Sequence, residues 1–166
     1  MGNIKPKFNI TPVLWSKPNY REYKLNVDGC FKGNPGSAGG GVYFGHSSNN
    51  LSKARVIKIG LKWCIDHGFN VLTIESDFLT VINMINKAAT TTWSIKEETN
   101  AIHNMISNGN FQFIHILREG NNTTDLLANF VELDRKNDFF TEIIHLPRKI
   151  LVTVKNDEEA RPNFKI

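Results

Sequence analysis

The sequence predicts an α/β fold in which helices cover both faces of a mixed sheet. Three observations lead to this class. Two short strand-like runs come first, helical periodicity begins at Leu51, and buried strand-like runs then alternate with helical segments. The chain of 166 residues is 40% hydrophobic and 22% charged, which is typical of one globular domain.

The first elements are predicted from changes of period along the chain. Residues 23–29, "YKLNVDG", alternate as a strand does, and residues 40–44, "GGVYF", form a short second strand. The glycine-rich residues 30–39 between them are predicted to be a turn region. The next helix ends at Gly68, and its buried face carries Ala54, Ile57, Leu61, Cys64 and Ile65.

The later elements alternate between strand and helix. Strands are predicted at residues 70–76 and 111–119, and helices at 79–89, 94–109 and 123–135. Since antiparallel strands precede these parallel units, we expect the sheet to be mixed.

The chain is expected to contain one folded domain with two flanks. Residues 24–135 form the domain. Residues 1–23 form an extended arm, because Pro6, Pro12 and Pro18 interrupt any helix there. Residues 136–166 form a C-terminal tail to which the sequence assigns little structure.

Composition restricts location and partners. No apolar run approaches the roughly 20 residues that span a bilayer, and the N-terminal residues lack the apolar core of a secretory signal. Cys30 and Cys64 cannot form a disulfide framework and have no metal-type spacing with the histidines. We therefore expect an intracellular monomer of the cytoplasm or nucleus with no membrane partner. The formal charge of +4 and pI near 9.1 favour a polyanionic partner.

Three acids stand at the ends of predicted elements. Asp28 ends the first strand, Asp77 ends the strand after the first helix, and Asp125 lies in the opening turn of the last helix. In open α/β sheets, chemistry gathers beyond the strand ends, so the three carboxylates can converge. Each also has a structural explanation: a turn residue for Asp28, a helix cap for Asp77, and a first-turn acid for Asp125.

Four segments of the sequence together resemble the ribonuclease H type 1 family, most closely its plant and retroelement-like branch. The matching segments, in the family's order, are "KLNVDGCFKGNPGSAGGG", "SSNNLSKARVIKIGLKWC", "LTIESD" and "HILREGNNTTDLLAN". The resemblance covers roughly residues 23–135, about two thirds of the chain, and implies a ribonuclease H-like mixed sheet.

The resemblance implies a metal-dependent nuclease site. The family hydrolyses the RNA strand of an RNA–DNA hybrid, using four acids that hold two Mg²⁺ ions. By resemblance, Asp28 bridges the ions, Asp77 shares one of them, and Asp125 holds the other. Two metals about 4 Å apart generate the attacking hydroxide and stabilise the leaving oxygen. The implied cofactor is Mg²⁺, and the implied partner is an RNA–DNA hybrid or another nucleic acid.

The second family acid, a glutamate, is replaced by Lys53 in this chain. An ammonium group donates hydrogen bonds but cannot ligate a cation, and the first turn of a helix disfavours a base by about 0.3–1 kcal/mol. Two explanations stay open: relaxed selection on a decayed nuclease, or an ammonium that stands in for one metal beside Asp28 and Asp77. We predict that hydrolysis is severely weakened or absent.

A second departure from the family lies between residues 40–44 and the "SSNN" at 47–50. The family usually places a full hairpin here, ending in a third strand. We therefore predict a truncated second/third strand hairpin, with an unpaired edge on the neighbouring strand.

Three asparagines match family positions that touch the minor groove of the hybrid: Asn34, Asn49 and Asn50. Recognition there depends on shape and on 2′-hydroxyl groups, which amide side chains can address. The structural alternatives are a turn for Asn34 and a helix N-cap for Asn50. A phosphate-facing surface can include further basic residues: Lys32, Arg55, Lys58, Lys62 and Arg118.

Three functions compete. The first is an RNA–DNA hybrid endoribonuclease with residual activity, and the second is a non-catalytic nucleic-acid-binding module on the same scaffold. The third is a decayed retroelement fragment. Other chemistries lack their patterns: the glycines match no phosphate-binding loop, and the histidines have no zinc-type spacing.

Overall fold

The computed structural model describes the chain in seven ranges. These are residues 10–20, 22–28, 30–33, 36–39, 43–47, 49–134 and 143–165. Side chains are described within these ranges except at residues 30–47, 131–134 and 143.

A three-stranded parallel sheet lies at the centre, in the order β2-β6-β7. Its strands are β2 (Lys24–Asn26), β6 (Val71–Ser76) and β7 (Asn110–His115). These strands confirm three of the predicted strands with shorter bounds.

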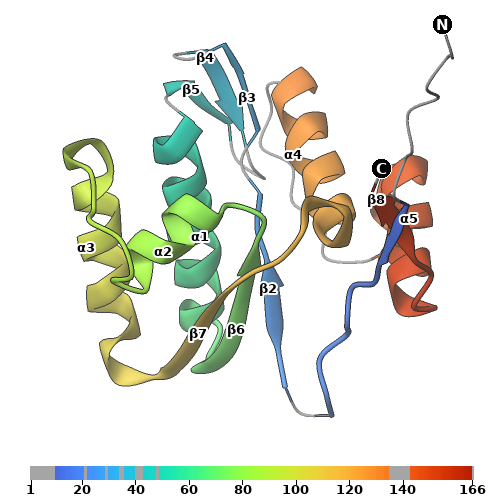
Figure 1. Ribbon diagram of the computed structural model, residues 1–166, viewed down its shortest axis with the longest axis horizontal. Helices are drawn as coiled ribbons and strands as arrows, with labels where there is room; N and C mark the ends of the chain where they lie inside the picture. The colour runs from blue at the N-terminus through green and yellow to red at the C-terminus, as the bar shows by residue number, and fades with distance from the viewer. Residues whose placement is uncertain are drawn as a thin grey trace, which may run out of the picture.

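A second, antiparallel sheet lies beyond the end of β2, as Figure 1 shows. It comprises β3 (Cys30–Gly33), β4 (Gly36–Gly39) and β5 (Tyr43–Ser47), paired in chain order. The prediction of a turn across residues 30–39 is therefore wrong. The reason is that a glycine-rich run carries no side-chain alternation from which a strand can be recognised. The predicted truncation of the hairpin is also wrong, because β5 pairs antiparallel with β4 as a third strand, and strands of only 4 and 5 residues fit the few residues available.

Helices cover both sides of the parallel sheet (Figure 1), with α1, α2 and α3 on one side and α4 and α5 on the other. Their bounds are Asn49–Asp66, Leu79–Ile85, Lys96–Met105, Asn122–Asp134 and Arg148–Glu158. Short 3-10 turns lie at Trp93–Ile95, Ile106–Asn108, Arg118–Asn121 and Ile143–His145. Helices α1 to α4 confirm the four predicted helices. Within the described ranges, no helix has both the length and the apolar character needed to cross a membrane.

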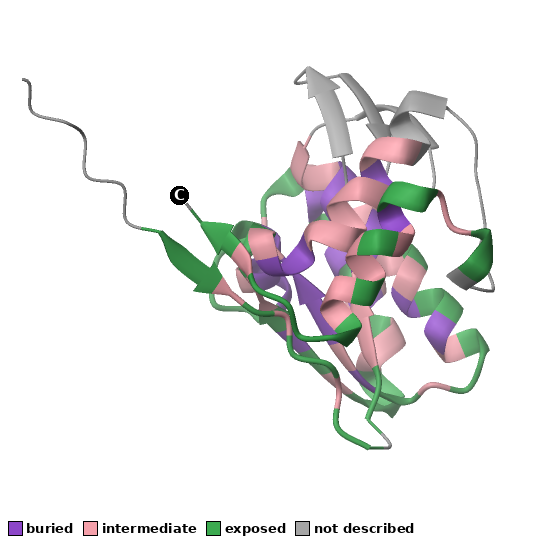
Figure 2. Cartoon of the chain, turned by 90° about the vertical axis from the view of Figure 1, so that its right-hand side faces the viewer, coloured by how far each residue is buried: buried purple, intermediate pink, exposed green. Residues whose placement is uncertain are grey.

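The two flanks meet in space. Strand β1 (Thr11–Val13) pairs antiparallel with β8 (Asn163–Lys165), and Figure 2 shows this pair exposed at one side of the molecule. The sequence assigned little structure to residues 136–166, which is wrong for α5 and β8. The partner of β8 lies at the other end of the chain, and α5 packs on α4 while burying Ile150 at 2% exposure. The amphipathic period of α5 could have been recognised from the sequence, whereas β8 leaves no local signal.

The core forms between α1 and the parallel sheet, and residues of α2 and α3 extend it. The predicted apolar face of α1 is confirmed, since Ala54, Ile57 and Leu61 are fully buried. A Cβ atom on Gly60 would lie 3.1 Å from the Leu25 side chain, so this glycine allows α1 to approach β2 closely. Gly68 follows the helix with a φ of +85°, a backbone conformation that favours glycine. Gly60 thereby lets the middle of α1 pack against β2.

Candidate functional site

Two of the predicted site residues, Asp28 and Asp77, follow neighbouring parallel strands. Asn26 of β2 pairs with Glu75 of β6, and each aspartate lies two residues beyond its member of that pair. The pairing continues past β2, because the Val27 amide donates to the Glu75 carbonyl at 3.0 Å. Equal spacing from one paired position brings the two carboxylates to the same edge of the sheet.

Lys53 lies between these two carboxylates. Its Nζ forms an ion pair with Asp28 Oδ1 and lies 3.7 Å from Asp77 Oδ1. The lysine side chain is 9% exposed and its Nζ sits 4.6 Å from the centre of the Phe78 ring. A buried ammonium group therefore occupies the space that separates the two acids.

Asp125 joins the cluster from α4 together with a second cation, Arg118. The guanidinium group of Arg118 donates to Asp125 Oδ1 at 2.8 Å. This hydrogen bond and the charge of Asp125 raise the pKa of Arg118, and the charges of Asp28 and Asp77 act in the same direction. Arg118 therefore pairs directly with Asp125, while Asp28 and Asp77 act on it only through their charge.

The electrostatics of Asp28 reflect both burial and its neighbours. Burial raises the pKa of the Asp28 carboxyl, whereas the charge and hydrogen bond of Lys53 lower it. Asp77 and Asp125 add to the rise by like-charge repulsion. The pKa of Asp28 therefore stays above its ordinary value despite the ion pair. Three carboxylates, one ammonium and one guanidinium leave a single formal negative charge in the cluster.

The structural explanation offered for Asp77, a helix cap, does not hold. Phe78 occupies the N-cap of α2, and no side chain donates or accepts a capping hydrogen bond there. The Asp77 Oδ1 atom is buried and has no hydrogen-bond partner within the described protein, its nearest cation being Lys53. Local helix stability accounts for neither the placement nor the burial of this carboxylate.

Of the three asparagines predicted to contact substrate, two lie within the described residues. Asn49 is the first residue of α1, and its buried Oδ1 has no hydrogen-bond partner in the described protein. Asn50 lies inside the first turn of α1, so it is not the N-cap that the sequence suggested. Asn34 lies outside the described residues.

The basic residues proposed for a phosphate-facing surface are largely occupied by acids of the protein. Arg55 Nε lies 3.0 Å from Glu98 Oε1 of α3, and Lys58 pairs with the other oxygen of Glu98. Lys62 Nζ lies 2.9 Å from Asp66 Oδ2 along the surface of α1. The side chain of Lys32 is not described. Arg55 and Lys58 therefore connect α1 to α3, which is a role that their spacing alone did not reveal.

Sequence reasoning missed a polar network beneath the carboxylate cluster. Buried Glu75 receives hydrogen bonds from Trp15 Nε1 at 2.8 Å and Asn26 Nδ2 at 3.2 Å, and it pairs with Lys24 at 2.7 Å. Asn121, 2% exposed, donates to the Val27 carbonyl at 3.1 Å. The network joins β2, β6 and the start of α4, which carry the three aspartates. Only the buried position of Glu75 within a strand could have signalled it.

The residues present do not fit a pair of divalent cations. Lys53 stands where the family resemblance implies a ligand, and its ammonium cannot ligate a cation. Arg118 already occupies an oxygen of Asp125. Among the described residues, no group of three or more His, Cys, Asp or Glu side chains is arranged to hold a metal ion. Within the cluster, the charges of Lys53 and Arg118 offset two of the three negative charges of the aspartates.

Comparisons with solved structures identify the fold. RNase H1 from the halophilic archaeon Halobacterium salinarum NRC-1 superposes with a TM-score of 0.64 at 22% identity, covering 69% of this chain and 99% of that one. LC11-RNase H1, isolated from compost by a metagenomic approach and solved with an RNA/DNA hybrid, gives 0.62 at 21% identity over 68% and 97%. The N-terminal RNase H domain of a Mycobacterium tuberculosis protein, fused to maltose binding protein, gives 0.61 at 19% identity over 66% and 98%.

These likenesses confirm the predicted ribonuclease H-like fold, a mixed α/β arrangement. No curated protein sequence matches the chain. The family model described as Reverse transcriptase-like matches residues 43–131, which is more than half of the chain and includes Lys53, Asp77 and Asp125. The chain therefore belongs to the Reverse transcriptase-like family.

Proposed function

We propose that this chain is a nucleic-acid-binding domain of ribonuclease H type whose hydrolysis of the RNA strand is lost or severely weakened. The observation that carries the proposal is the buried Lys53 ammonium between Asp28 and Asp77. The natural partner is an RNA–DNA hybrid or another nucleic acid, which agrees with the formal charge of +4.

The loss of hydrolysis follows from the charge of the cluster. The resemblance implies Mg²⁺, which would supply the attacking hydroxide and stabilise the leaving oxygen. Oxygen ligands that gather such ions must be free of competing cations, yet Lys53 and Arg118 already pair with the aspartates. With Glu in place of Lys53 and no basic partner, the four acids would carry a formal charge of −4. In this chain the Lys53 ammonium offsets negative charge of the aspartates that Mg²⁺ would otherwise offset.

Binding of nucleic acid is supported by two features near the cluster. Internal neutralisation removes most of the repulsion that unpaired carboxylates exert on a phosphate backbone. The buried Asn49 Oδ1 has no partner within the described protein, although buried polar atoms are normally satisfied. The resemblance assigns Asn49 to the minor groove of the hybrid, where a 2′-hydroxyl group is a donor for an amide oxygen.

Cleavage of an end-labelled RNA–DNA hybrid, with Mg²⁺ and separately with Mn²⁺, tests the loss of hydrolysis. We expect no turnover by the unmodified chain and measurable turnover by Lys53→Glu. Lys62→Glu is the matched control, because it makes the same charge change on the exposed side of the same helix. Robust cleavage by the unmodified chain would show the proposal to be wrong.

Binding of the same hybrid in EDTA separates the module from a decayed fragment. We expect the folded chain to bind hybrid without divalent cations, with affinity that falls as salt rises. Asn49→Ala is expected to weaken binding of the hybrid. The helix content of the protein, measured by circular dichroism, is expected to stay the same. A folded chain that binds neither hybrid nor duplex would favour the decayed-fragment alternative.

The proposal also covers the family branch of the chain, its domain bounds and its location. We place the chain in the plant and retroelement-like branch, with residues 24–135 as the nucleic-acid-binding domain. Residues 1–23 and 136–166 are its flanks, and the paired strands β1 and β8 support treating them together. We propose a monomer of the cytoplasm or nucleus, a location consistent with the buried free thiol of Cys64.

A further inference from the structure

The lysines and arginines of this protein differ in whether an acid of the protein pairs with them. On α1 and in the carboxylate cluster, each described cation forms an ion pair. The basic residues to which the described part of the chain offers no ion-pair partner are Lys17, Lys87, Lys96, Arg148, Lys149, Lys155 and Lys165. Three of these lie on α5, and no other described helix or strand contributes more than one.

The three cations lie on the outer face of α5. Arg148, Lys149 and Lys155 are all exposed. Because a helix turns once in 3.6 residues, Arg148, Val152 and Lys155 form one stripe along it. Val152 lies between two of the cations and is 51% exposed, so the described protein does not cover this stripe.

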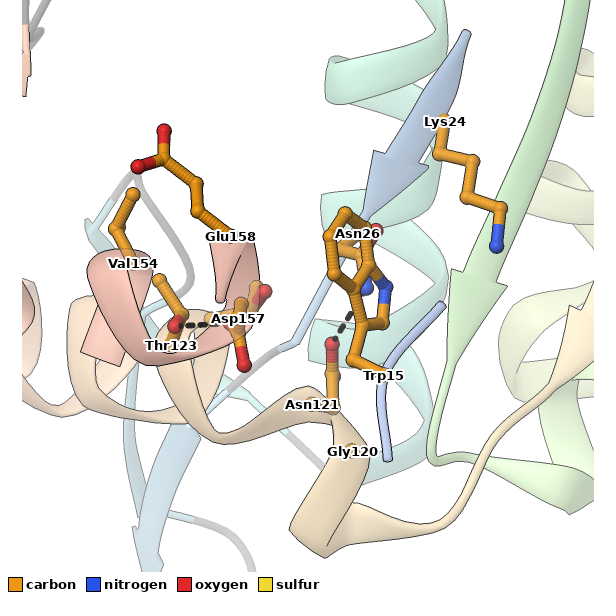
Figure 3. A pocket seen from close by; sticks show the side chains of 10 residues that line it. Trp15, Lys24, Asn26, Gly120, Asn121, Thr123, Val154, Asp157 and Glu158 are labelled. Carbon is orange, nitrogen blue, oxygen red and sulfur yellow. Dashed lines mark hydrogen bonds between the residues drawn. The ribbon is translucent and has the colours of Figure 1, made fainter. Parts of the chain in front are cut away.

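The opposite face of α5 packs on the protein. It buries Ile150 at 2% exposure, and Thr123 at the start of α4 donates to Asp157 at 2.7 Å. Figure 3 shows Asp157 beside Thr123, at the edge of a pocket of about 340 Å³ that Val154 and Trp15 also line. The inner face therefore holds α5 in place, and the cations of the outer face are accessible to a ligand.

Local helix stability does not explain two of these bases. Arg148 and Lys149 occupy the first turn of α5, where the helix dipole is positive and bases are disfavoured. That turn contains no acid, and no side chain caps it. The two positive charges therefore oppose the dipole and are not compensated within the described residues.

We propose that the outer face of α5 binds the phosphate backbone of a nucleic acid. The inference rests on the proposed function and extends its contact surface to a helix outside the residues 43–131 matched by the family model. Arg148 and Lys155 are separated by about 10 Å along the helix axis, a length over which one strand of a duplex carries about three phosphates. Contacts of this kind add affinity without reading the base sequence.

An anionic membrane surface fits this face less well. A helix that lies on a membrane presents a broad apolar face beside its basic one. The inner face of α5 directs Ile150 and Val154 into the protein, and among the large apolar residues of α5 only Val152 is strongly exposed. Charge alone therefore remains on the outer face, and a phosphate backbone requires no more than that.

Binding of a fluorescently labelled RNA–DNA hybrid to the full chain in EDTA, followed by anisotropy from about 50 to about 200 mM NaCl, tests the proposal. The variant combines Arg148→Gln, Lys149→Gln and Lys155→Gln. We expect its affinity at the lowest salt to fall about tenfold or more, and the slope of log K against log salt concentration to decrease in magnitude by about 2–3. Its thermal stability should not fall, because two of the changes remove bases from the first turn of α5.

The matched control combines Lys17→Gln, Lys87→Gln and Lys165→Gln, which removes the same charge from exposed lysines on other parts of the chain. We expect this control to keep most of the affinity and of the salt dependence. Equal effects in the two variants, or none in the α5 variant, would overturn this inference alone, whereas no hybrid binding by the unmodified chain would overturn the proposed function with it. Vesicles of phosphatidylserine and phosphatidylcholine provide the last comparison: if the α5 variant loses vesicle binding while it keeps hybrid binding, the face binds a membrane and the inference is wrong.

Discussion

Two regions of this molecule gather carboxylates, and they treat them in opposite ways. At the carboxyl ends of β2 and β6, Asp28 and Asp77 enclose the buried ammonium of Lys53. In the pocket beside α5, Asp157 and Glu158 meet no cation among the described residues. The family resemblance points to the first region as the place where cations bind. In the second region, Asp157 accepts a hydrogen bond from Thr123 and Glu158 is exposed to solvent.

The difference shows that the position of an acid does not by itself define a cation site. A carboxylate attracts a ligand cation only when the protein has not supplied a cation of its own. Lys53, the fifth residue of α1, therefore changes the chemistry of the cluster that Asp28 and Asp77 form. At the end of α5 the acids carry their charge without a cation, since Thr123 donates a hydrogen bond to Asp157 and Glu158 reaches solvent.

The largest effect is expected for Lys53→Met. Removing the ammonium leaves Asp28 buried beside Asp77 without a counter-charge, which typically costs about 3–5 kcal/mol. The free energy of unfolding, measured with urea at pH 7, gives this loss. The pKa of Asp28 is already raised by burial, so the stability that this group contributes is present at low pH and lost as pH rises. Removing Lys53 raises the pKa of Asp28 further. The loss in the free energy of unfolding caused by Lys53→Met is therefore expected to be smaller at acidic pH.

Lys62→Met provides the control for that measurement. Lys62 is a lysine of the same helix whose side chain is 62% exposed, and surface substitutions usually change stability by less than about 0.5 kcal/mol. Equal losses in Lys53→Met and Lys62→Met would mean that the buried ion pair contributes nothing, and the contrast between the two acid regions would disappear.

A smaller effect is expected when Lys53→Glu is combined with divalent cations. The added carboxylate increases repulsion within the cluster, and an ion that binds only the folded state relieves it. At about 100 times its dissociation constant, such an ion adds about 2.7 kcal/mol of stability. Thermal unfolding with and without Mg²⁺ measures this gain in the variant, and Lys62→Glu controls for general salt effects. If Mg²⁺ stabilises the unmodified chain as much as it stabilises Lys53→Glu, the Lys53 ammonium does not block cation binding at the site.

Much of the fold could be predicted because its signals are local. Helices α1 to α4 and the parallel strands have a regular apolar period, and the fully buried Ala54, Ile57 and Leu61 confirm it. Strand β4 could not be found in the same way, since two of its four residues are glycines, and β3 is only four residues long. Strand β8 depends on a partner near the other end of the chain. Pairing over such a separation leaves no trace in a local window.

The candidate site likewise contains residues that local sequence signals predict and residues that they do not. Asp28, Asp77 and Lys53 could be placed together because two strand ends and one helix start are local features that the topology brings to one edge. The support from Glu75 and Asn121 could not be predicted, because each bond joins residues 49 to 95 positions apart. The counter-charge of Arg118 was also missed: a surface arginine was expected to face phosphate, whereas it pairs with Asp125.

The smallest effect, and one of opposite sign, is expected for Asp157→Asn. At neutral pH this change removes a negative charge from the C-terminal end of α5, where it opposes the helix dipole, and it should stabilise the protein by about 0.3–1 kcal/mol. The hydrogen bond from Thr123 can be kept, because the asparagine carbonyl still accepts it.

The pH dependence of the Asp157→Asn difference distinguishes this explanation from a change in packing. Burial raises the pKa of Asp157 above its ordinary 3.8, so the aspartate contributes its full stability below that pH and loses it as pH rises through the folded-state pKa. The advantage of the asparagine variant should therefore be present at pH 7 and vanish below about pH 3.8. Glu158 and Lys24 are the charged neighbours on the same pocket, and Glu158→Gln measures the contribution of the adjacent acid. A loss of stability in Asp157→Asn at pH 7 would mean that this carboxylate is already neutralised, as Asp28 is, and that the two acid regions do not differ in this respect.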